Sequence, residues 1–162
     1  MTLNVLILGL VTLSRLVELP FARANTRRLL ADGGREVAPG HYPFIVALHA
    51  AWLLSLWALA LDRSVNIPLL ILFGLVELAR IWVLTTLGRR WTTRIVVVPG
   101  EKLVARGPYR LLNHPNYAVV VAEIALLPLV FGLWPVALVF TLLNAAALTV
   151  RIREENRALG RG

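Results

Sequence analysis

Ahead of a long apolar run, residues 118–128, the chain reads Gly107-Pro108-Tyr109-Arg110-Leu111-Leu112-Asn113-His114-Pro115-Asn116-Tyr117. Proline suits the first turn of a helix and pushes the residue before it out of the α region. Pro115 therefore predicts the start of a helix, with His114 or Asn113 extended just before it. The N-terminus of such a helix presents free N–H groups and suits a carboxylate or phosphate. A tight loop that merely enters a membrane helix would use the same residue types, so both interpretations stay open.

The composition places this stretch in a membrane protein. Hydrophobic residues make up 58% of the 162 residues, and the mean hydropathy is +0.73, well above the balance of a soluble domain. Several apolar runs are long enough to cross a hydrocarbon core of about 30 Å. The sequence predicts one all-α membrane domain over residues 1–162, with five spans at residues 2–19, 44–61, 67–87, 117–130 and 135–150. The chain has no cysteine, which excludes disulfides, thiolate metal sites and cysteine nucleophiles.

The basic residues predict how the chain crosses the membrane. Residues 20–43, 88–116 and 151–162 contain 14 of the 17 Lys and Arg residues, and only Arg63 lies in a predicted outer loop. By the positive-inside rule, the N-terminus is outside and the C-terminus is cytoplasmic. The same arrangement accounts for the net charge of +8 without nucleic acid, because the arginines face the cytoplasm and anionic lipid head groups.

Three polar segments carry secondary structure of their own in this interpretation. The arginines that follow Pro20 predict an interfacial amphipathic helix that ends before Gly33. Residues 94–98 and 102–105 flank Pro99-Gly100 and predict a cytoplasmic β-hairpin. Arg151 to Arg161 predicts a charged terminal helix.

Charged side chains inside predicted spans usually mark function, because burying them in lipid is costly. They lie in the inner half of the bilayer or near its midplane, and they are Arg15, Glu18, Glu77, Arg80 and Glu123, with His49 as a neutral companion. The three-residue spacing of Arg15/Glu18 and of Glu77/Arg80 predicts ion pairs on one helical face. These pairs could be structural glue, but for Glu77, Arg80 and Glu123 we favour a polar cavity.

Two motifs, together with an acidic pair, resemble the isoprenylcysteine carboxyl methyltransferase family. They are Gly107-Pro108-Tyr109-Arg110, His114-Pro115-Asn116-Tyr117 and, about forty residues later, Glu154-Glu155. A second stretch, residues 18–49 with His41-Tyr42-Pro43 and His49, resembles a bacterial branch that methylates alkylpyrones and alkylresorcinols. The resemblance implies an enzyme of the bacterial cytoplasmic membrane that uses S-adenosylmethionine and no metal. Its acceptor would be a lipophilic small molecule that enters from the bilayer, and no obligate protein partner is expected.

The resemblance also implies a cofactor site, made by Gly107, Tyr109, Arg110, His114, Pro115, Tyr117, Glu154 and Glu155. These residue types suit the cofactor. Its carboxylate could bind the helix N-terminus at Pro115, and its ribose could bind the carboxylates of Glu154 and Glu155. Glu154 and Glu155 could equally form exposed helix pairs with Arg151 and Arg157.

The position of Asn113 bears on the acceptor. Prenylcysteine enzymes of the family carry arginine immediately before the His-Pro pair, where this chain has Asn113. Arginine suits a substrate carboxylate through its bidentate fork and asparagine does not, which favours a phenol or enol over a prenylcysteine carboxylate. A phenol has a pKa of about 10 and needs a base. The catalytic candidates are His114, Asn113, Glu77, Arg80 and His49, with the two histidines and Glu77 as possible bases.

Three other functions share parts of this pattern. A phospholipid amine N-methyltransferase would use the same cofactor on a lipid amine. A membrane reductase with a nicotinamide cofactor would share the Tyr and His-Pro pattern, although it would have further spans. A non-enzymatic subunit or small transporter would line a solute path with Glu77 and Arg80.

Overall fold

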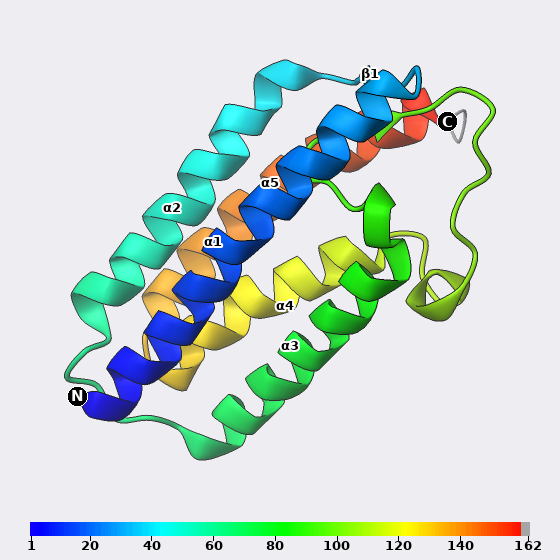
Figure 1. The fold of residues 1–162 in the computed structure, drawn as a ribbon. Helices are drawn as coiled ribbons and strands as arrows, with labels where there is room; N and C mark the ends of the chain where they lie inside the picture. Colours follow the sequence, from blue (N-terminus) through cyan, green and yellow to red (C-terminus); the bar gives the residue numbers. More distant parts are fainter. Residues whose placement is uncertain (160–162) are drawn as a thin grey trace.

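The computed structural model describes residues 1–159, which form a bundle of helices with one short sheet (Figure 1). The helices are α1 (Thr2–Ala31), α2 (Tyr42–Leu59), α3 (Ile67–Leu87), α4 (Pro115–Val130) and α5 (Trp134–Ala158), the strands are β1 (Arg35–Glu36) and β2 (Val96–Val97), and short 3₁₀ turns cover Pro39–His41, Gly88–Arg90 and Gly107–Arg110. The predicted all-α class is therefore confirmed.

Four of the helices, α1, α2, α3 and α5, are long and apolar enough to cross a membrane. Helix α4 lies where the fourth span was predicted, but its 16 residues extend only about 24 Å, less than a hydrocarbon core of about 30 Å. A full crossing by α4 and the direction of the chain across the membrane stay predictions.

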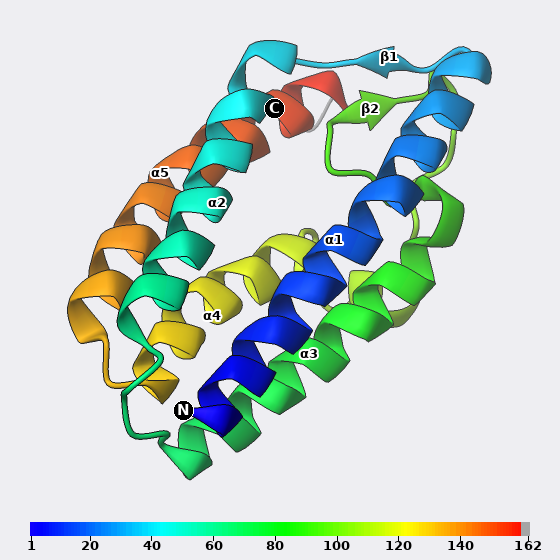
Figure 2. The same cartoon turned by 60° about the vertical axis from the view of Figure 1, so that its left-hand side comes forward.

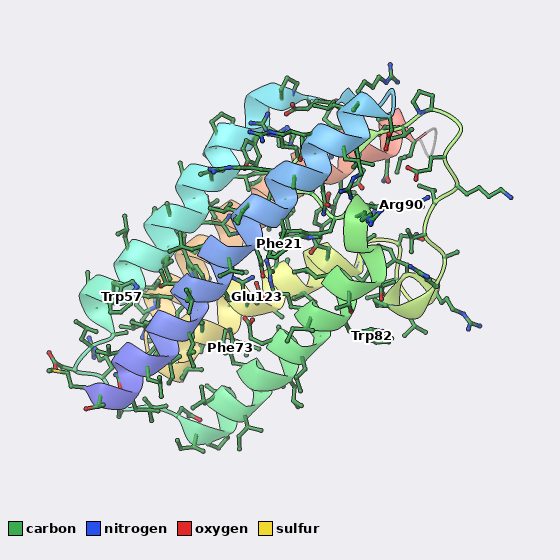
Figure 3. The ribbon with its side chains drawn as sticks, viewed as in Figure 1. Phe21, Trp57, Phe73, Trp82, Arg90 and Glu123 are labelled. Atoms are coloured by element: carbon green, nitrogen blue, oxygen red, sulfur yellow. The ribbon has the colours of Figure 1, made fainter. Side chains whose placement is uncertain are left out.

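Large apolar side chains cover the outside of the bundle as well as its core. Phe21 and Trp82 are 62% and 50% exposed, whereas Phe73 is buried (Figure 3). The core joins all five long helices, and its fully buried residues include Leu8, Leu56 and Leu127. An apolar exterior around an apolar core is the pattern of an integral membrane protein.

The prediction of a separate interfacial helix after Pro20 is wrong. Helix α1 continues through Pro20 to Ala31, so the arginines that follow belong to the same helix. An internal proline removes one hydrogen bond of the helix, and tertiary contacts hold the turns beyond it. Asn25 donates to the carbonyls of Gly88 and Trp91 at 3.1 and 2.8 Å. Helix α5 likewise continues past residue 150 into the predicted terminal helix, of which Arg161 lies outside the described residues.

The predicted β-hairpin is also wrong, although its turn is present. Glu101 donates its backbone N–H to the carbonyl of Val98 at 3.3 Å, but residues 102–105 form no strand. Strand β2 instead pairs antiparallel with β1, with Arg35 opposite Val97. The sheet therefore ties the α1–α2 connection to the α3–α4 connection at one end of the bundle, beside the C-terminal end of α5 (Figure 2).

Candidate functional site

Helix α4 begins at Pro115, as the sequence predicts. His114 before it has φ −132° and ψ 60°, outside the helical region. A 3₁₀ turn over Gly107–Arg110 leads into this start. Gly107 has φ +56°, and a Cβ there would lie 2.7 Å from Thr86 Oγ1 of α3. Glycine is needed on both counts, because the turn lies directly against α3.

A cavity of about 210 Å³ lies at this end of the bundle, between β2, the loop after it, the start of α4 and the end of α5. We call it the loop cavity. Its lining includes Tyr109, Asn113, His114, Tyr117, Arg151 and Glu155, with Arg90 and Lys102 as further cations and Val96, Val97, Leu103 and Val104 as apolar surface. Tyr109, His114, Tyr117 and Glu155 belong to the predicted cofactor set, so the fold brings them together.

The polar side chains of the loop cavity form one connected chain. Arg151 donates from Nε to the hydroxyl of Tyr117 at 2.9 Å, and this hydroxyl donates to Glu155 Oε2 at 2.5 Å. His114 Nδ1 lies 3.7 Å from the same carboxylate oxygen, and its Nε2 lies 3.2 Å from Asn156 Oδ1. The His114 ring also stacks on Tyr117 at 5.3 Å between centroids. Glu155 is thus held in place by two aromatic residues of the His-Pro motif.

Tyr109 contributes a hydroxyl that stays protonated. Burial, and then the nearby negative charge of Glu155, raise the pKa of Tyr109 well above its ordinary value. The phenol is therefore a hydrogen-bond donor toward a ligand rather than a base.

Other members of the predicted cofactor set lie outside the loop cavity. Arg110 is exposed and does not line it. Glu154 points elsewhere and pairs with Arg157 at 2.8 Å, the exposed helix pair that the sequence allowed. Gly107 and Pro115 shape the backbone beside the cavity without lining it.

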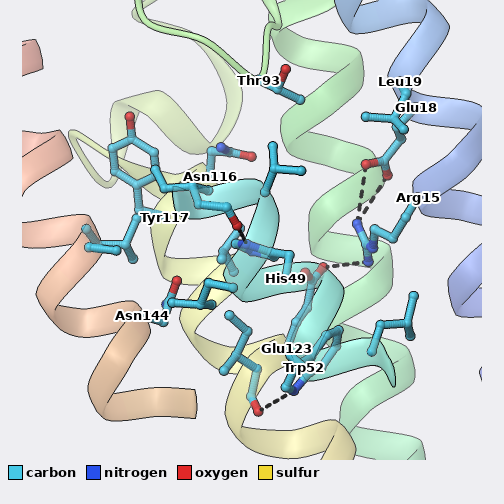
Figure 4. A pocket seen from close by; sticks show the side chains of 18 of the residues that line it. Arg15, Glu18, Leu19, His49, Trp52, Thr93, Asn116, Tyr117, Glu123 and Asn144 are labelled. Atoms are coloured by element: carbon cyan, nitrogen blue, oxygen red, sulfur yellow. Dashed lines mark hydrogen bonds and ion pairs between the residues drawn. The ribbon is translucent and has the colours of Figure 1, made fainter. Parts of the chain in front are cut away.

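A second cavity, of about 280 Å³, lies deeper among the helices and we call it the bundle cavity. Residues of all five long helices line it, apolar and polar in about equal number, and Figure 4 shows His49, Asn144, Glu123 and Arg15 among the side chains around it. His49 and Arg80 therefore line this cavity as predicted. Asn113 does not, since it lies at the loop cavity, and Glu77 lines neither.

Five charged side chains form a cluster beside the bundle cavity, and all of them except Glu77 line it. Arg15 contacts Glu18 at 3.2 Å, Glu77 at 2.9 Å and Glu123 at 3.2 Å. Arg80 contacts Glu18 at 2.5 Å and Glu123 at 3.1 Å. The predicted Arg15/Glu18 pair is confirmed, but the predicted Glu77/Arg80 pair does not form, because each group finds its partner on another helix. Three carboxylates face two guanidinium groups, which leaves one formal negative charge in excess.

His49 presents one ring nitrogen to the bundle cavity. Its Nδ1 lies 2.8 Å from the carbonyl of Ile45 one turn earlier. A carbonyl only accepts, so Nδ1 carries the hydrogen and Nε2 of the neutral ring keeps a lone pair. His49 can therefore accept a proton from a group bound in the cavity.

The two cavities share a wall, made by Trp91, Thr92, Asn116, Tyr117 and Arg151. Arg151 is only 7% exposed and donates from Nη1 to the carbonyl of Thr93 at 2.9 Å. The sequence predicts for Arg151 only an exposed pair with the glutamates. Its place at the cytoplasmic end of a predicted span was the signal for a buried role.

Comparisons with known proteins show the family to which the chain belongs. The model of the isoprenylcysteine carboxyl methyltransferase family matches residues 69–161, which include the shared wall and the loop cavity's glutamate. The uncharacterized protein YpbQ of Bacillus subtilis (strain 168) is 38% identical over 161 residues, which cover 95% of each chain. No solved structure matches the chain significantly. The chain belongs to the isoprenylcysteine carboxyl methyltransferase family, a family of membrane methyltransferases.

Proposed function

We propose that the protein transfers a methyl group from S-adenosylmethionine, bound in the loop cavity, to a lipophilic acceptor in the bundle cavity. The observation that carries the proposal is the wall that the two cavities share, at Tyr117 and Arg151. Methyl transfer needs two ligands in line and close together, and a common wall between a polar and an apolar cavity supplies that arrangement.

The loop cavity has the groups that S-adenosylmethionine requires. The carboxylate of Glu155, fixed by Tyr117, suits the ribose hydroxyls or the amino group. Lys102 suits the ligand's carboxylate, whereas Arg90 is already paired with Glu101. The valines of β2 and Leu103 provide an apolar surface for the adenine. The residues present therefore fit the cofactor.

The bundle cavity suits an acceptor with an apolar tail. Leu16 of α1 and Val46 of α2 line it, although they are 58% and 47% exposed on the outside of the bundle. The cavity thus reaches the apolar exterior between these two helices, which supports lateral entry from the lipid.

The residues of the bundle cavity also provide for the acceptor's proton. Bound S-adenosylmethionine supplies an electrophilic methyl group on a sulfonium. The acceptor hydroxyl would lose its proton as it receives this methyl group, and His49 Nε2 would take that proton. The carboxylate of Glu123, which lines the same cavity, stabilises the imidazolium that results. His114, which is held by Glu155 and Asn156 beside the loop cavity, is less well placed for this step.

The acceptor proposed is a neutral hydroxyl compound such as an alkylresorcinol or an alkylpyrone. A base at His49 serves a hydroxyl, which must lose a proton, whereas a carboxylate is already ionised and needs no base. An amine also loses a proton when it is methylated, so a phospholipid amine is the second candidate. We further propose that the loop cavity faces the cytoplasm of a bacterial cell, where the cofactor is made.

Two neighbouring glutamates give a matched test of the cofactor site. Glu155→Gln should weaken S-adenosylmethionine binding by about 1.5–3 kcal/mol, the usual value for a hydrogen bond to a charged group. Glu154→Gln should leave the affinity unchanged, because Glu154 points to Arg157. Isothermal titration of both variants in detergent measures the difference. Equal effects of the two changes would remove the loop cavity as the cofactor site.

A panel of acceptors then tests the reaction. Wild-type protein in liposomes is given S-adenosylmethionine with an alkylresorcinol, an alkylpyrone, a farnesylated cysteine or phosphatidylethanolamine. We expect methyl transfer to the first two. Preference for the farnesylated cysteine would overturn the choice of acceptor but keep the methyltransferase, and preference for phosphatidylethanolamine would establish the second candidate.

A further inference from the structure

Asn144 is a buried polar residue with an unmet hydrogen-bonding need. It lies within α5 and is 2% exposed. Its Nδ2 has no hydrogen-bond partner among residues 1–159. The residue lines the bundle cavity (Figure 4). A buried amide without a hydrogen-bond partner costs free energy. A ligand that accepts a hydrogen bond from Nδ2 would remove this cost.

The chain contains a matched asparagine that shows the contrast. Asn4 of α1 is also 2% exposed, but its Nδ2 donates to the carbonyls of Ala60 and Arg63 at 2.6 and 2.8 Å. Asn4 therefore fastens α1 to the turn after α2. Asn144 is equally buried, but its Nδ2 makes no such bond between helices.

Neighbouring polar groups of the bundle cavity do have partners. Trp52 donates from Nε1 to the carbonyl of Ile124 at 3.3 Å. His49 Nδ1 donates to the carbonyl of Ile45 on the same helix, and Arg15 and Glu123 pair within the charged cluster. Among residues 1–159, the buried side-chain atoms without a hydrogen-bond partner are Asn144 Nδ2 and His41 Nε2, and of these two residues only Asn144 lines the bundle cavity.

We propose that the amide of Asn144 binds a second oxygen on the polar ring of the acceptor. This inference rests on the proposed function, in which His49 takes the proton from the hydroxyl that is methylated. A primary amide both donates and accepts, so it can bind a carbonyl or a hydroxyl oxygen. The acceptor class is thus an amphipathic lipid whose ring carries the reacting hydroxyl and one further oxygen, and Asn144 selects for that oxygen.

The test compares two rings that differ by one oxygen. A resorcinol and a phenol with the same alkyl chain are methylated by wild type, by Asn144→Leu and by Asn4→Leu, and kcat/KM is measured for each. Wild type should prefer the resorcinol by about tenfold or more, since a site built to bind an oxygen rejects the analogue that lacks it. In Asn144→Leu the ratio should fall to near one, mainly through KM for the resorcinol. Asn4→Leu should keep the wild-type ratio.

Thermal unfolding separates selection from a structural role. Asn144→Leu replaces an unpaired amide by an apolar group of similar size, so Tm should stay or rise. Asn4→Leu breaks two hydrogen bonds, so Tm should fall. A fall for Asn144→Leu as large as that for Asn4→Leu would overturn the inference.

The outcomes also separate this inference from the proposed function. If wild type binds S-adenosylmethionine but does not distinguish the two rings, or methylates neither, the role of Asn144 is wrong and the cofactor site stands. An unchanged ratio in Asn144→Leu has the same meaning. If wild type does not bind S-adenosylmethionine, both the proposed function and this inference fail.

Discussion

At the scale of single residues, Tyr117 connects the two cavities. Its hydroxyl accepts from Arg151 and donates to Glu155, and its ring stacks on His114. Arg151 has no carboxylate within ion-pairing distance among residues 1–159, so this hydroxyl and the carbonyl of Thr93 are what its buried cation contacts. One side chain of the His-Pro motif thus positions both a cation and an anion at the shared wall.

Tyr117→Phe should therefore weaken S-adenosylmethionine binding about tenfold. The change keeps the ring stack but removes the hydroxyl that orients Glu155, a loss typical of a hydrogen bond to a charged group. Titration calorimetry in detergent measures it. Tyr42→Phe is the control, because the Tyr42 hydroxyl contacts Thr93 and does not line the loop cavity. Equal weakening in the two variants would contradict the role of Tyr117.

At the scale of elements, the charged cluster joins three helices. Arg15 and Glu18 come from α1, Glu77 and Arg80 from α3, and Glu123 from α4. Breaking a buried ion pair by removing one partner usually costs about 3–5 kcal/mol, because it leaves an uncompensated charge.

Arg80→Met should lower the free energy of unfolding by about this amount, since Glu18 and Glu123 both lose their guanidinium partner. Adding Glu123→Gln should recover part of the loss, because one of the unpaired charges is then removed. Denaturant unfolding in detergent gives both values. Arg157→Met removes an exposed pair and should change stability by less than about 1 kcal/mol. A small effect of Arg80→Met would mean that the cluster does not hold the helices together.

The two-stranded sheet also positions the loop cavity, because strand β2 forms part of the cavity wall. The chain has no cysteine, so an introduced disulfide reports the strand register cleanly. Arg35→Cys with Val97→Cys should cross-link on oxidation, since these residues lie opposite each other at a separation that a disulfide can bridge. Val97→Cys with Lys102→Cys, which a hairpin would pair, should stay reduced. Mass spectrometry of free thiols measures the cross-linking of both variants. A cross-link in the second variant and not in the first would support the predicted hairpin.

At the scale of the whole molecule, the polar connections and the end of α5 gather at one end of the bundle. The N-terminus and the α2–α3 turn lie at the other (Figures 1 and 2). This arrangement agrees with the distribution of basic residues along the chain. The loop cavity and the basic segments therefore lie at the same end of the bundle.

Single cysteines can test that orientation. In whole cells, a membrane-impermeant maleimide should label Ser64→Cys directly but Arg110→Cys only after the cells are permeabilised. Both positions are exposed and lie outside the long helices, so access to the reagent decides the result. Labelling of Arg110→Cys in intact cells would invert the predicted topology and place the loop cavity outside.

The sequence by itself determined the local features of this protein. Proline and glycine act on their own backbone, so the helix start at Pro115 and the turn at Gly107 were predictable. The span over residues 67–87 coincides with α3, because apolar composition alone marks a membrane helix. Of the cofactor set that the family motifs implied, Tyr109, His114, Tyr117 and Glu155 line the loop cavity.

Only the tertiary structure decided which of these groups meet. Glu154 and Glu155 are alike in sequence, but successive helix residues point about 100° apart, and only one reaches the loop cavity. Strand β2 could have paired with β1 or with residues 102–105, because the sequence of a strand does not specify its partner. Arg15 contacts Glu123 across 108 positions of the chain. Such contacts, like the free amide of Asn144, depend on how whole helices rotate and pack, which no local pattern records.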